Sequence, residues 1–285
     1  MAHEQPAYQI AVMSRNEISI AIDWARSEGW NPGLSDVDCF YAADHSGFLV
    51  GKIDGRPVAT ISAVKYGESF GFVGLYIVAE GFRRQGYGIQ IWNKALEYLQ
   101  GRTIGLDGVV AQQENYRKSG FRLAHRNIRF AGLAKNVISL SANVVELSTV
   151  EFDKLAAYDS HFFPTTRERF LKAWIDQPGC GALGILEHAE LCGYGVIRPC
   201  HAGYKIGPLN AESRDLAATL FDALVARVPV GTAIYLDTPE PNVQALELAR
   251  SYDMQPSFET ARMYIGSCPD LALHKIFGIT SFELG

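Results

Sequence analysis

The alternation of apolar and polar positions divides the first half of the chain into helices and strands. Apolar residues at three- and four-residue spacing predict helices over residues 18–28 and 89–99, and a glycine follows each of them closely. A hairpin is predicted over residues 48–64, because Asp54-Gly55 is a favoured turn between two apolar, β-branched runs. The remaining predicted elements are strands over residues 70–78, 103–110 and 121–130 and a short helix over residues 112–119.

The second half repeats this order of elements. A second hairpin is predicted first, followed by a strand, a helix, a strand and a last helix, over residues 182–197, 204–209, 215–228, 232–237 and 242–252. The two halves are weakly similar residue by residue but agree in element order. Alternating strands and helices predict an α/β fold, and the repetition predicts a tandem duplication with a boundary near residues 133–145. We expect two domains, residues 1–134 and residues 140–285.

The composition is that of a globular protein and disfavours several classes of partner and site. The 285-residue chain is 48% hydrophobic and 20% charged, as expected of a globular protein with a large core. No apolar stretch reaches membrane-spanning length, and the start, MAHEQPAYQ, lacks a secretory signal pattern. The five cysteines form no CxxC pair and the histidines show no metal-ligand spacing, so we expect no disulfide framework, no metal and a cytoplasmic location. A net charge of −5 disfavours nucleic acid as a partner.

The sequence RRQGYG, residues 83–88, lies between a predicted strand and a predicted helix. A loop in this place presents unpaired backbone N–H groups at the positive end of the helix dipole, and its glycines let those groups face a ligand. Arg83 and Arg84 add charge-assisted contacts to phosphate. The Walker pattern G-x-x-x-x-G-K is absent, and Ile91 stands where a dinucleotide loop needs its third glycine. The loop predicts a pyrophosphate site.

In this strand–helix setting, the loop resembles the GNAT superfamily of acetyl-CoA-dependent N-acetyltransferases, whose hallmark is Q/R-x-x-G-x-G/A. A second segment, NYRKSGF at residues 115–121, is similar to the Y-x-x-x-G-F ending of that family. The chain departs from the family at Glu80, where a proline is usual, and it lacks N-x-x-A before the tyrosine. The resemblance implies two tandem GNAT folds, each with a central mixed β-sheet flanked by helices, and acetyl-CoA as co-substrate.

The resemblance also implies roles for individual residues. The loop amides would hold the CoA pyrophosphate, and the strand before the loop would pair with the pantetheine arm. The expected cofactor-binding residues are Tyr76, Ile77, Val78, Arg83, Arg84, Gln85, Gly86, Tyr87, Gly88 and Ile89. Tyr116 would lie beside the thioester sulfur as general acid, because a phenol with an ordinary pKa of about 10 can protonate a thiolate leaving group.

The acceptor side of the site is less defined by the sequence. The family places an acceptor loop near GWNPGLSD, so Trp30, Asn31 and Asp36 are expected to contact an amine through cation–π and charge interactions. Glu68 is a candidate for the base that deprotonates the amine, and a solvated loop carboxylate is the alternative interpretation. Acidic loops favour a cationic primary amine, either on a small molecule or on a protein lysine. The predicted assembly is a monomer or a homodimer.

The second half departs from the family at both motifs. Between its strand and helix it reads NAESRD, with no glycine and with Glu212 and Asp215 where phosphate would bind. Carboxylates in that place repel phosphate. Ala249 stands at the position of the tyrosine. We expect a single acetyl-CoA site per chain, in the first half, and a second GNAT-like domain without cofactor.

Two alternatives to an N-acetyltransferase remain open from the sequence. GESFG satisfies the hydrolase pattern G-x-S-x-G with Ser69 as nucleophile, and Asp237 and His274 follow in the order of a catalytic triad. That pattern requires a helix directly after the serine, whereas the sequence here predicts a strand. The other alternative is a sensor that binds acyl-CoA without turnover, since the same loop would serve it.

Overall fold

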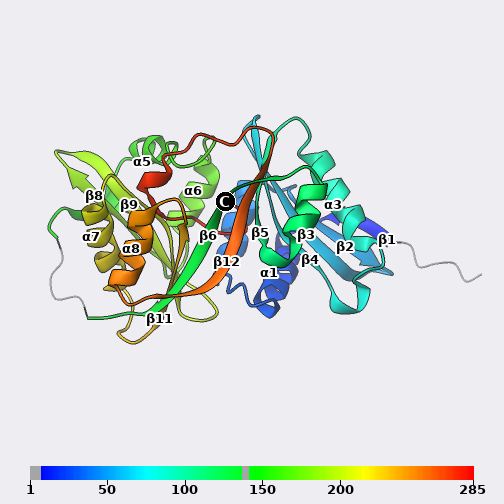
Figure 1. The fold of residues 1–285 in the computed structure, drawn as a ribbon, viewed down its shortest axis with the longest axis horizontal. Coiled ribbons are helices and arrows are strands. Elements are labelled where there is room, and N and C mark those ends of the chain that lie inside the picture. The colour runs from blue at the N-terminus through cyan, green and yellow to red at the C-terminus, as the bar shows by residue number, and fades with distance from the viewer. Residues whose placement is uncertain (1–7, 137–140) are drawn as a thin grey trace, which may run out of the picture.

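The computed structural model describes residues 8–136 and 141–285. Figure 1 shows two lobes side by side, with the strands β6 (Arg122–Leu133) and β12 (Gln255–Ile265) between them. The predicted domain boundary, near residues 133–145, includes residues 137–140. The N-terminal segment MAHEQPAYQ, which lacks a secretory signal pattern, includes residues 1–7. Residues 1–7 and 137–140 lie outside the described residues.

The elements of each half follow the predicted order. The first half also contains β1 (Tyr8–Val12), η1 (Arg15–Glu17), α1 (Ile18–Ser27), α2 (Asp36–Ala43), β2 (Phe48–Ile53), β3 (Arg56–Tyr66), β4 (Phe70–Val78), η2 (Glu80–Phe82), α3 (Tyr87–Tyr98), β5 (Thr103–Val109), η3 (Val110–Gln112) and α4 (Gln113–Lys118). The second half contains β7 (Val144–Glu146), η4 (Leu147–Thr149), α5 (Phe152–Asp159), α6 (Glu168–Ile175), β8 (Gly181–Glu187), β9 (Glu190–Pro199), β10 (Tyr204–Ala211), α7 (Arg214–Val225), β11 (Ala233–Pro239), α8 (Val243–Ser251), η5 (Leu273–Lys275) and β13 (Ile276–Gly278). The α/β fold class is confirmed.

Several elements were not predicted. The helices α2, α5 and α6 have eight residues each, too short for a clear apolar repeat. Strand β12 was missed because its first residues are exposed and its later ones are fully buried, so the strand has no period-two pattern. The omission matters, since β12 is central to the sheet.

All strands of the described residues join one mixed sheet, in the order β1-β2-β3-β4-β5-β12-β6-β11-β10-β9-β8-β7, with β13 paired to β10. The last long strand of each half is exchanged. Strand β12 of the second half pairs with β5 of the first, and β6 of the first half pairs with β11 of the second. Neither lobe therefore forms its sheet from one half of the chain alone.

Helices cover both faces of the first lobe. Helix α1 packs on one face through Ile18 and Ala21, together with Phe72 of β4. Helix α3 packs on the other face through Ile91 and Trp92. Trp174 of α6 belongs to the same core cluster as α1, so the second half of the chain completes the first core.

Candidate active site

Strands β4 and β5 separate halfway along their length. Their parallel pairing covers only Phe70–Val73 against Thr103–Leu106. Directly afterwards β4 bulges, because Leu75 adopts a left-handed φ of 48° and two residues of β4 lie opposite one residue of β3. The edge of β4 that faces β5 beyond Val73 is therefore left without a strand partner, and an extended ligand can pair with it.

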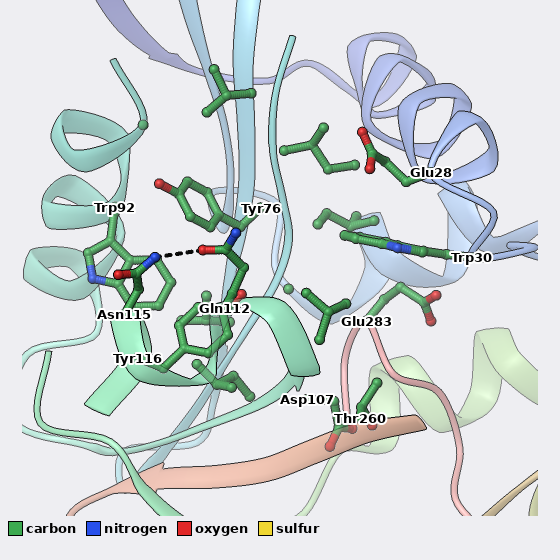
Figure 2. Close-up of a pocket in the computed structure, with 18 of the residues that line it drawn as sticks. Glu28, Trp30, Tyr76, Trp92, Asp107, Gln112, Asn115, Tyr116, Thr260 and Glu283 are labelled. Atoms are coloured by element: carbon green, nitrogen blue, oxygen red, sulfur yellow. Dashed lines mark hydrogen bonds between the residues drawn. The ribbon is translucent and has the colours of Figure 1, made fainter. Parts of the chain in front are cut away.

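A cavity of about 720 Å³ occupies this separation. Its walls come from β4, β5, the loop before α3, and α4, together with residues from the second half of the chain. Figure 2 shows Tyr76, Trp92 and Tyr116 on one side of the cavity and Trp30 and Glu28 on the other. The predicted strand residues Tyr76, Ile77 and Val78 all line it.

The loop RRQGYG closes one end of the cavity. Gly86 has a φ of +86° and precedes the first turn of α3, which has no side-chain cap. Among the described residues, we find no hydrogen-bond acceptor for the backbone amides of Arg84, Gln85 and Gly86. A Cβ on Gly88 would lie 2.6 Å from the hydroxyl oxygen of Tyr76, so glycine is needed there for α3 to approach β4. The loop thus presents free donors at a helix N-terminus, the arrangement that binds phosphate.

The side chains of the loop point in different directions. Arg83 donates to the carbonyl of Val78 at 2.9 Å and forms an ion pair with Glu28 across the cavity. Arg84 lines the cavity and makes no hydrogen bond or ion pair within the described part of the chain, so its charge is available to a ligand.

Two of the predicted loop side chains point away from the cavity. The Gln85 amide donates to the Gly81 carbonyl at 2.9 Å, and the Tyr87 ring packs on Tyr8. Ile89, by contrast, lines the cavity.

Tyr116 lies at the other end of the open edge of β4. Its ring stacks on Trp92 with 5.4 Å between centroids and covers Gly108 of β5, where a Cβ would stand 2.5 Å from the ring. Burial raises the pKa of the Tyr116 hydroxyl above its ordinary value, and the nearby Tyr76 adds to the effect. The phenol therefore stays protonated at neutral pH, as a proton donor must.

Of the three residues expected to contact the acceptor, only Trp30 lines the cavity in the structure. The Asn31 side chain instead exchanges hydrogen bonds with the backbone of Ala202, at 2.9 and 3.0 Å. Asp36 is fully buried, where it accepts from Gly33 and Arg198. The expectation that Asp36 receives an amine is wrong, because its carboxylate is enclosed and already paired.

Glu68 does not belong to the cavity. It lies in the turn between β3 and β4, its side chain is fully exposed, and it is not among the lining residues. We correct the expectation that it acts as base, since the turn is at the opposite end of β4 from the loop.

The hydrolase alternative is not supported either. Ser69 precedes a strand, and Asp237 is bound in a buried ion pair with Arg129.

The second half supplies one wall that the sequence did not indicate. Phe258 and Thr260 come from β12, while Phe282 and Glu283 come from the segment after β13. The carbonyl oxygen of Glu283 packs directly on Gly74, at the bulge of β4, where any Cβ would collide with it. No local pattern identifies these residues, because the exchanged strand β12 and the C-terminal segment bring them to the site from the second half of the chain.

Asp107 of β5 completes the lining. It accepts two hydrogen bonds from Arg262 of β12, at 2.8 and 2.7 Å, and one from Asn127 at 2.8 Å. Burial raises the pKa of the Asp107 carboxyl, while the Arg262 guanidinium opposes that shift. This carboxylate is fixed in place by the exchanged strand.

The equivalent place in the second half is filled by the chain itself. Strand β13 pairs with β10 just beyond the point where β10 leaves β11, and the Ile279 amide donates to the Asp237 carbonyl at 2.8 Å. The N-terminus of α7 is capped by Ser213, which accepts from Leu216 at 3.3 Å. Glu212 lies beside this cap and pairs with Lys275. Beside β10 and β13 there is a cavity of only about 30 Å³.

No helix in the described ranges is long and apolar enough to span a membrane. The same ranges contain no group of three or more His, Cys, Asp or Glu side chains arranged to hold a metal ion.

Strands β4 and β5 separate beside a glycine-bearing loop, and β10 and β11 separate in the same way in the second half, where the loop has no glycine. Such a pair of separating strands is typical of the acyl-CoA N-acyltransferase fold. Residues 16–121 match the model of the acetyltransferase (GNAT) family, and residues 155–278 match a further acetyltransferase (GNAT) domain model. The chain is 32% identical over 272 residues to a holothin acyltransferase of Pseudoalteromonas sp. (strain SANK 73390), covering 95% of this chain and 92% of that protein. The chain belongs to the GNAT superfamily of acyltransferases, as a member with two GNAT units in tandem.

Solved structures agree on the fold. A putative acetyltransferase from Pyrococcus horikoshii superposes with a TM-score of 0.84 at 22% identity, over 100% of this chain and 99% of that one. A tandem GNAT protein from the clavulanic acid biosynthesis pathway has a TM-score of 0.63 at 14% identity, over 92% and 100% of the chains. At these identities the likeness concerns the fold alone.

Proposed function

We propose that this acyltransferase moves an acetyl group from acetyl-CoA to a primary amine by direct transfer. The observation that carries the proposal is the open edge of β4, which lines one cavity together with the loop RRQGYG and the partly buried Tyr116. The similarity to a holothin acyltransferase supports a small-molecule acceptor in preference to a protein lysine.

The residues fit acetyl-CoA in three places. The amides of Arg84 to Gly86 and the Arg84 guanidinium would hold the pyrophosphate. The backbone of Tyr76 to Val78 would pair with the pantetheine arm, as an added strand does. Acetyl-CoA supplies the activated acetyl group as a thioester. The backbone at the β4 bulge would donate to the carbonyl oxygen as negative charge develops on it.

Tyr116 supplies the proton in this mechanism. The acceptor nitrogen forms its bond to the carbonyl carbon while the carbon–sulfur bond breaks, and Tyr116 donates a proton to the departing sulfur. The nitrogen releases one proton to solvent, and the phenol recovers its own. Trp92 holds the phenol ring in position by stacking on it.

We further propose separate roles for the two units. Residues 1–134 carry the acetyl-CoA site. Residues 140–285 bind no cofactor and form the acceptor wall, through Phe258, Thr260, Phe282 and Glu283. The exchanged strands β6 and β12 make the two units interdependent.

The experiment that tests this function measures thiol release by the full chain, with acetyl-CoA and a panel of amines, alongside calorimetric binding of acetyl-CoA. Binding together with amine-dependent thiol release is expected. Binding without turnover on any amine would favour the acyl-CoA sensor instead. Absence of binding would overturn both.

A further inference from the structure

The wall opposite Tyr76 is aromatic. Trp30 and Phe258 line the cavity and remain partly exposed, and Phe282 packs against Phe258 with 6.0 Å between ring centroids. Figure 2 shows the indole of Trp30 reaching into the cavity from the side opposite Tyr76. The rings of Trp30 and Phe258 therefore present flat apolar faces to the part of the cavity from which the acceptor would approach the thioester.

A single arginine holds this wall together. The Arg129 guanidinium donates to the Trp30 carbonyl at 2.9 Å and lies 4.7 Å from the ring centroid of Phe282 and 5.8 Å from that of Phe258. Its charge is neutralised by Asp237, with which it forms two hydrogen bonds of 2.6 and 2.7 Å. Arg129 thus packs on the rings of Phe282 and Phe258 and holds the backbone of Trp30.

The cavity has acidic residues but offers no free carboxylate to a cation. Three carboxylates line it in the described part of the chain. Glu28 is paired with Arg83, and Asp107 with Arg262. Both carboxylate oxygens of Glu283 are buried and have no hydrogen-bond partner in the described part of the chain, but the charges of Arg129, Arg198 and Lys205 already act on that carboxylate. A polyamine or aminoglycoside would lose hydration here without gaining a partner for its charges.

We propose that the acceptor is an uncharged amine carried on a planar aromatic or heteroaromatic ring, which stacks on Trp30 and Phe258. This inference rests on the proposed N-acetyltransferase function and specifies its acceptor. Stacking of a planar ring on an aromatic side chain contributes about 1–3 kcal/mol to binding. An amine conjugated to such a ring delocalises its lone pair and is neutral at pH 7.

A neutral amine also removes the need for a base. Its nitrogen attacks the thioester carbonyl directly, the carbon–nitrogen bond forms as the carbon–sulfur bond breaks, and the nitrogen then loses a proton to water. Tyr116 protonates the sulfur as before. The chemistry matches a cavity whose carboxylates are all paired or enclosed, and it replaces the cationic acceptor expected from the sequence.

The test compares ring-bearing and alkyl amines on the full chain. With saturating CoA, calorimetry is expected to show binding of 6-aminoquinoline at least 10-fold tighter than that of cyclohexylamine or spermidine. In the thiol-release assay with acetyl-CoA, kcat/KM should favour 6-aminoquinoline by a similar factor and stay constant between pH 6.5 and 8.5. Equal or tighter binding of either alkyl amine, or no binding of the planar amine at millimolar concentration, overturns the inference.

Variants at Trp30 and Phe258 test whether these two rings cause the preference for the planar amine. Trp30→Leu and Phe258→Leu should each raise KM for the planar amine about 10-fold and leave the Kd for acetyl-CoA unchanged. Tyr235→Leu is the matched control, since Tyr235 is a partly exposed ring on β11 outside the cavity. An unchanged KM in both wall variants contradicts the inference. If acetyl-CoA binds and alkyl amines are acetylated, only the inference fails; if no acetyl-CoA binds, the proposed function itself fails.

Discussion

Arg129 and Asp237 form a buried ion pair between two strands that come from different halves of the chain. They lie directly opposite each other on β6 and β11, and their side chains are only 3% and 1% exposed. Because β6 is an exchanged strand, this pair exists only when both halves fold together. It also supports the aromatic wall of the cavity through the contacts of Arg129 with Trp30 and Phe282.

Asp237→Asn is expected to destabilise the protein by about 3–5 kcal/mol, because it leaves a buried guanidinium without its counter-charge. Thermal unfolding should show the midpoint falling by about 5–8 °C, because a chain of this length has an unfolding entropy of about 0.6 kcal/mol/K. Glu97→Gln is the control, since Glu97 pairs with Lys94 on the exposed face of α3 and its loss should cost less than about 0.5 kcal/mol. Similar shifts in both variants would show that the buried pair has no special role.

Tyr116→Phe should lower kcat about 100-fold or more, because it removes the proposed general acid. The phenyl ring keeps its stacking on Trp92, so the Kd for acetyl-CoA should change less than about 3-fold. Steady-state kinetics and calorimetry measure the two quantities. Tyr252→Phe, which removes a hydroxyl bonded to Ala218 in the second half, is the control with unchanged kcat. An unaltered rate in Tyr116→Phe would remove its role as acid.

Gly86→Ala should raise the Kd for acetyl-CoA about 10-fold, because a left-handed backbone costs a non-glycine residue about 1–3 kcal/mol and the loop would change shape. Gly81→Ala is a close match. Both positions have open space for a Cβ, but Gly81 does not have a positive φ. Calorimetry measures the Kd for acetyl-CoA in both variants and so separates the effect of backbone conformation from that of an added methyl group. Equal affinities would contradict the assignment of this loop as the pyrophosphate site.

Calorimetric titration of the wild-type chain should give one acetyl-CoA per chain. In the second half, β13 occupies the space beside β10, and Ser213 already satisfies an amide of α7. The helix N-terminus there also faces Glu212, which repels phosphate. A stoichiometry of two would show that the second unit retains a cofactor site.

Stability should fall as the pH drops from about 6.5 towards 4. Burial lowers the pKa of His125 from 6.5 to about 4, and the Arg262 charge adds to the shift. The folded state keeps this imidazole neutral while the unfolded state takes up a proton, so stability is complete above pH 6.5 and is lost on acidification. The loss at pH 4 is at most about 3 kcal/mol, because each pKa unit corresponds to about 1.4 kcal/mol.

His125→Gln provides the comparison for this titration. Urea unfolding at pH 7 and at pH 5 should show a smaller difference in the variant than in the wild type, because the variant has no group that titrates in this window at this site. The same difference in both proteins would assign the acid sensitivity to other groups.

The sequence by itself determined the features that depend on neighbours along the chain. Helix α1, the hairpin of β2 and β3, and the loop before α3 each follow from local spacing, turn residues and glycines. The same is true of Tyr116, whose short helix α4 follows β5 after the single turn η3. The glycine-bearing loop between β4 and α3 is also a local feature, so a phosphate-binding loop could be proposed there from the sequence.

Only the tertiary structure decided which residues form the cavity wall opposite Tyr76. Asp36 and Glu68 appeared suitable in the sequence, yet one is enclosed with Arg198 and the other faces solvent. Phe258 reaches the cavity because β12 pairs with β6 and, from Thr260 onward, with β5 of the first half. Backbone hydrogen bonds between strands are the same whichever half of the chain supplies the strand. Strand exchange, and the cavity wall to which β12 contributes, therefore cannot be predicted from local sequence.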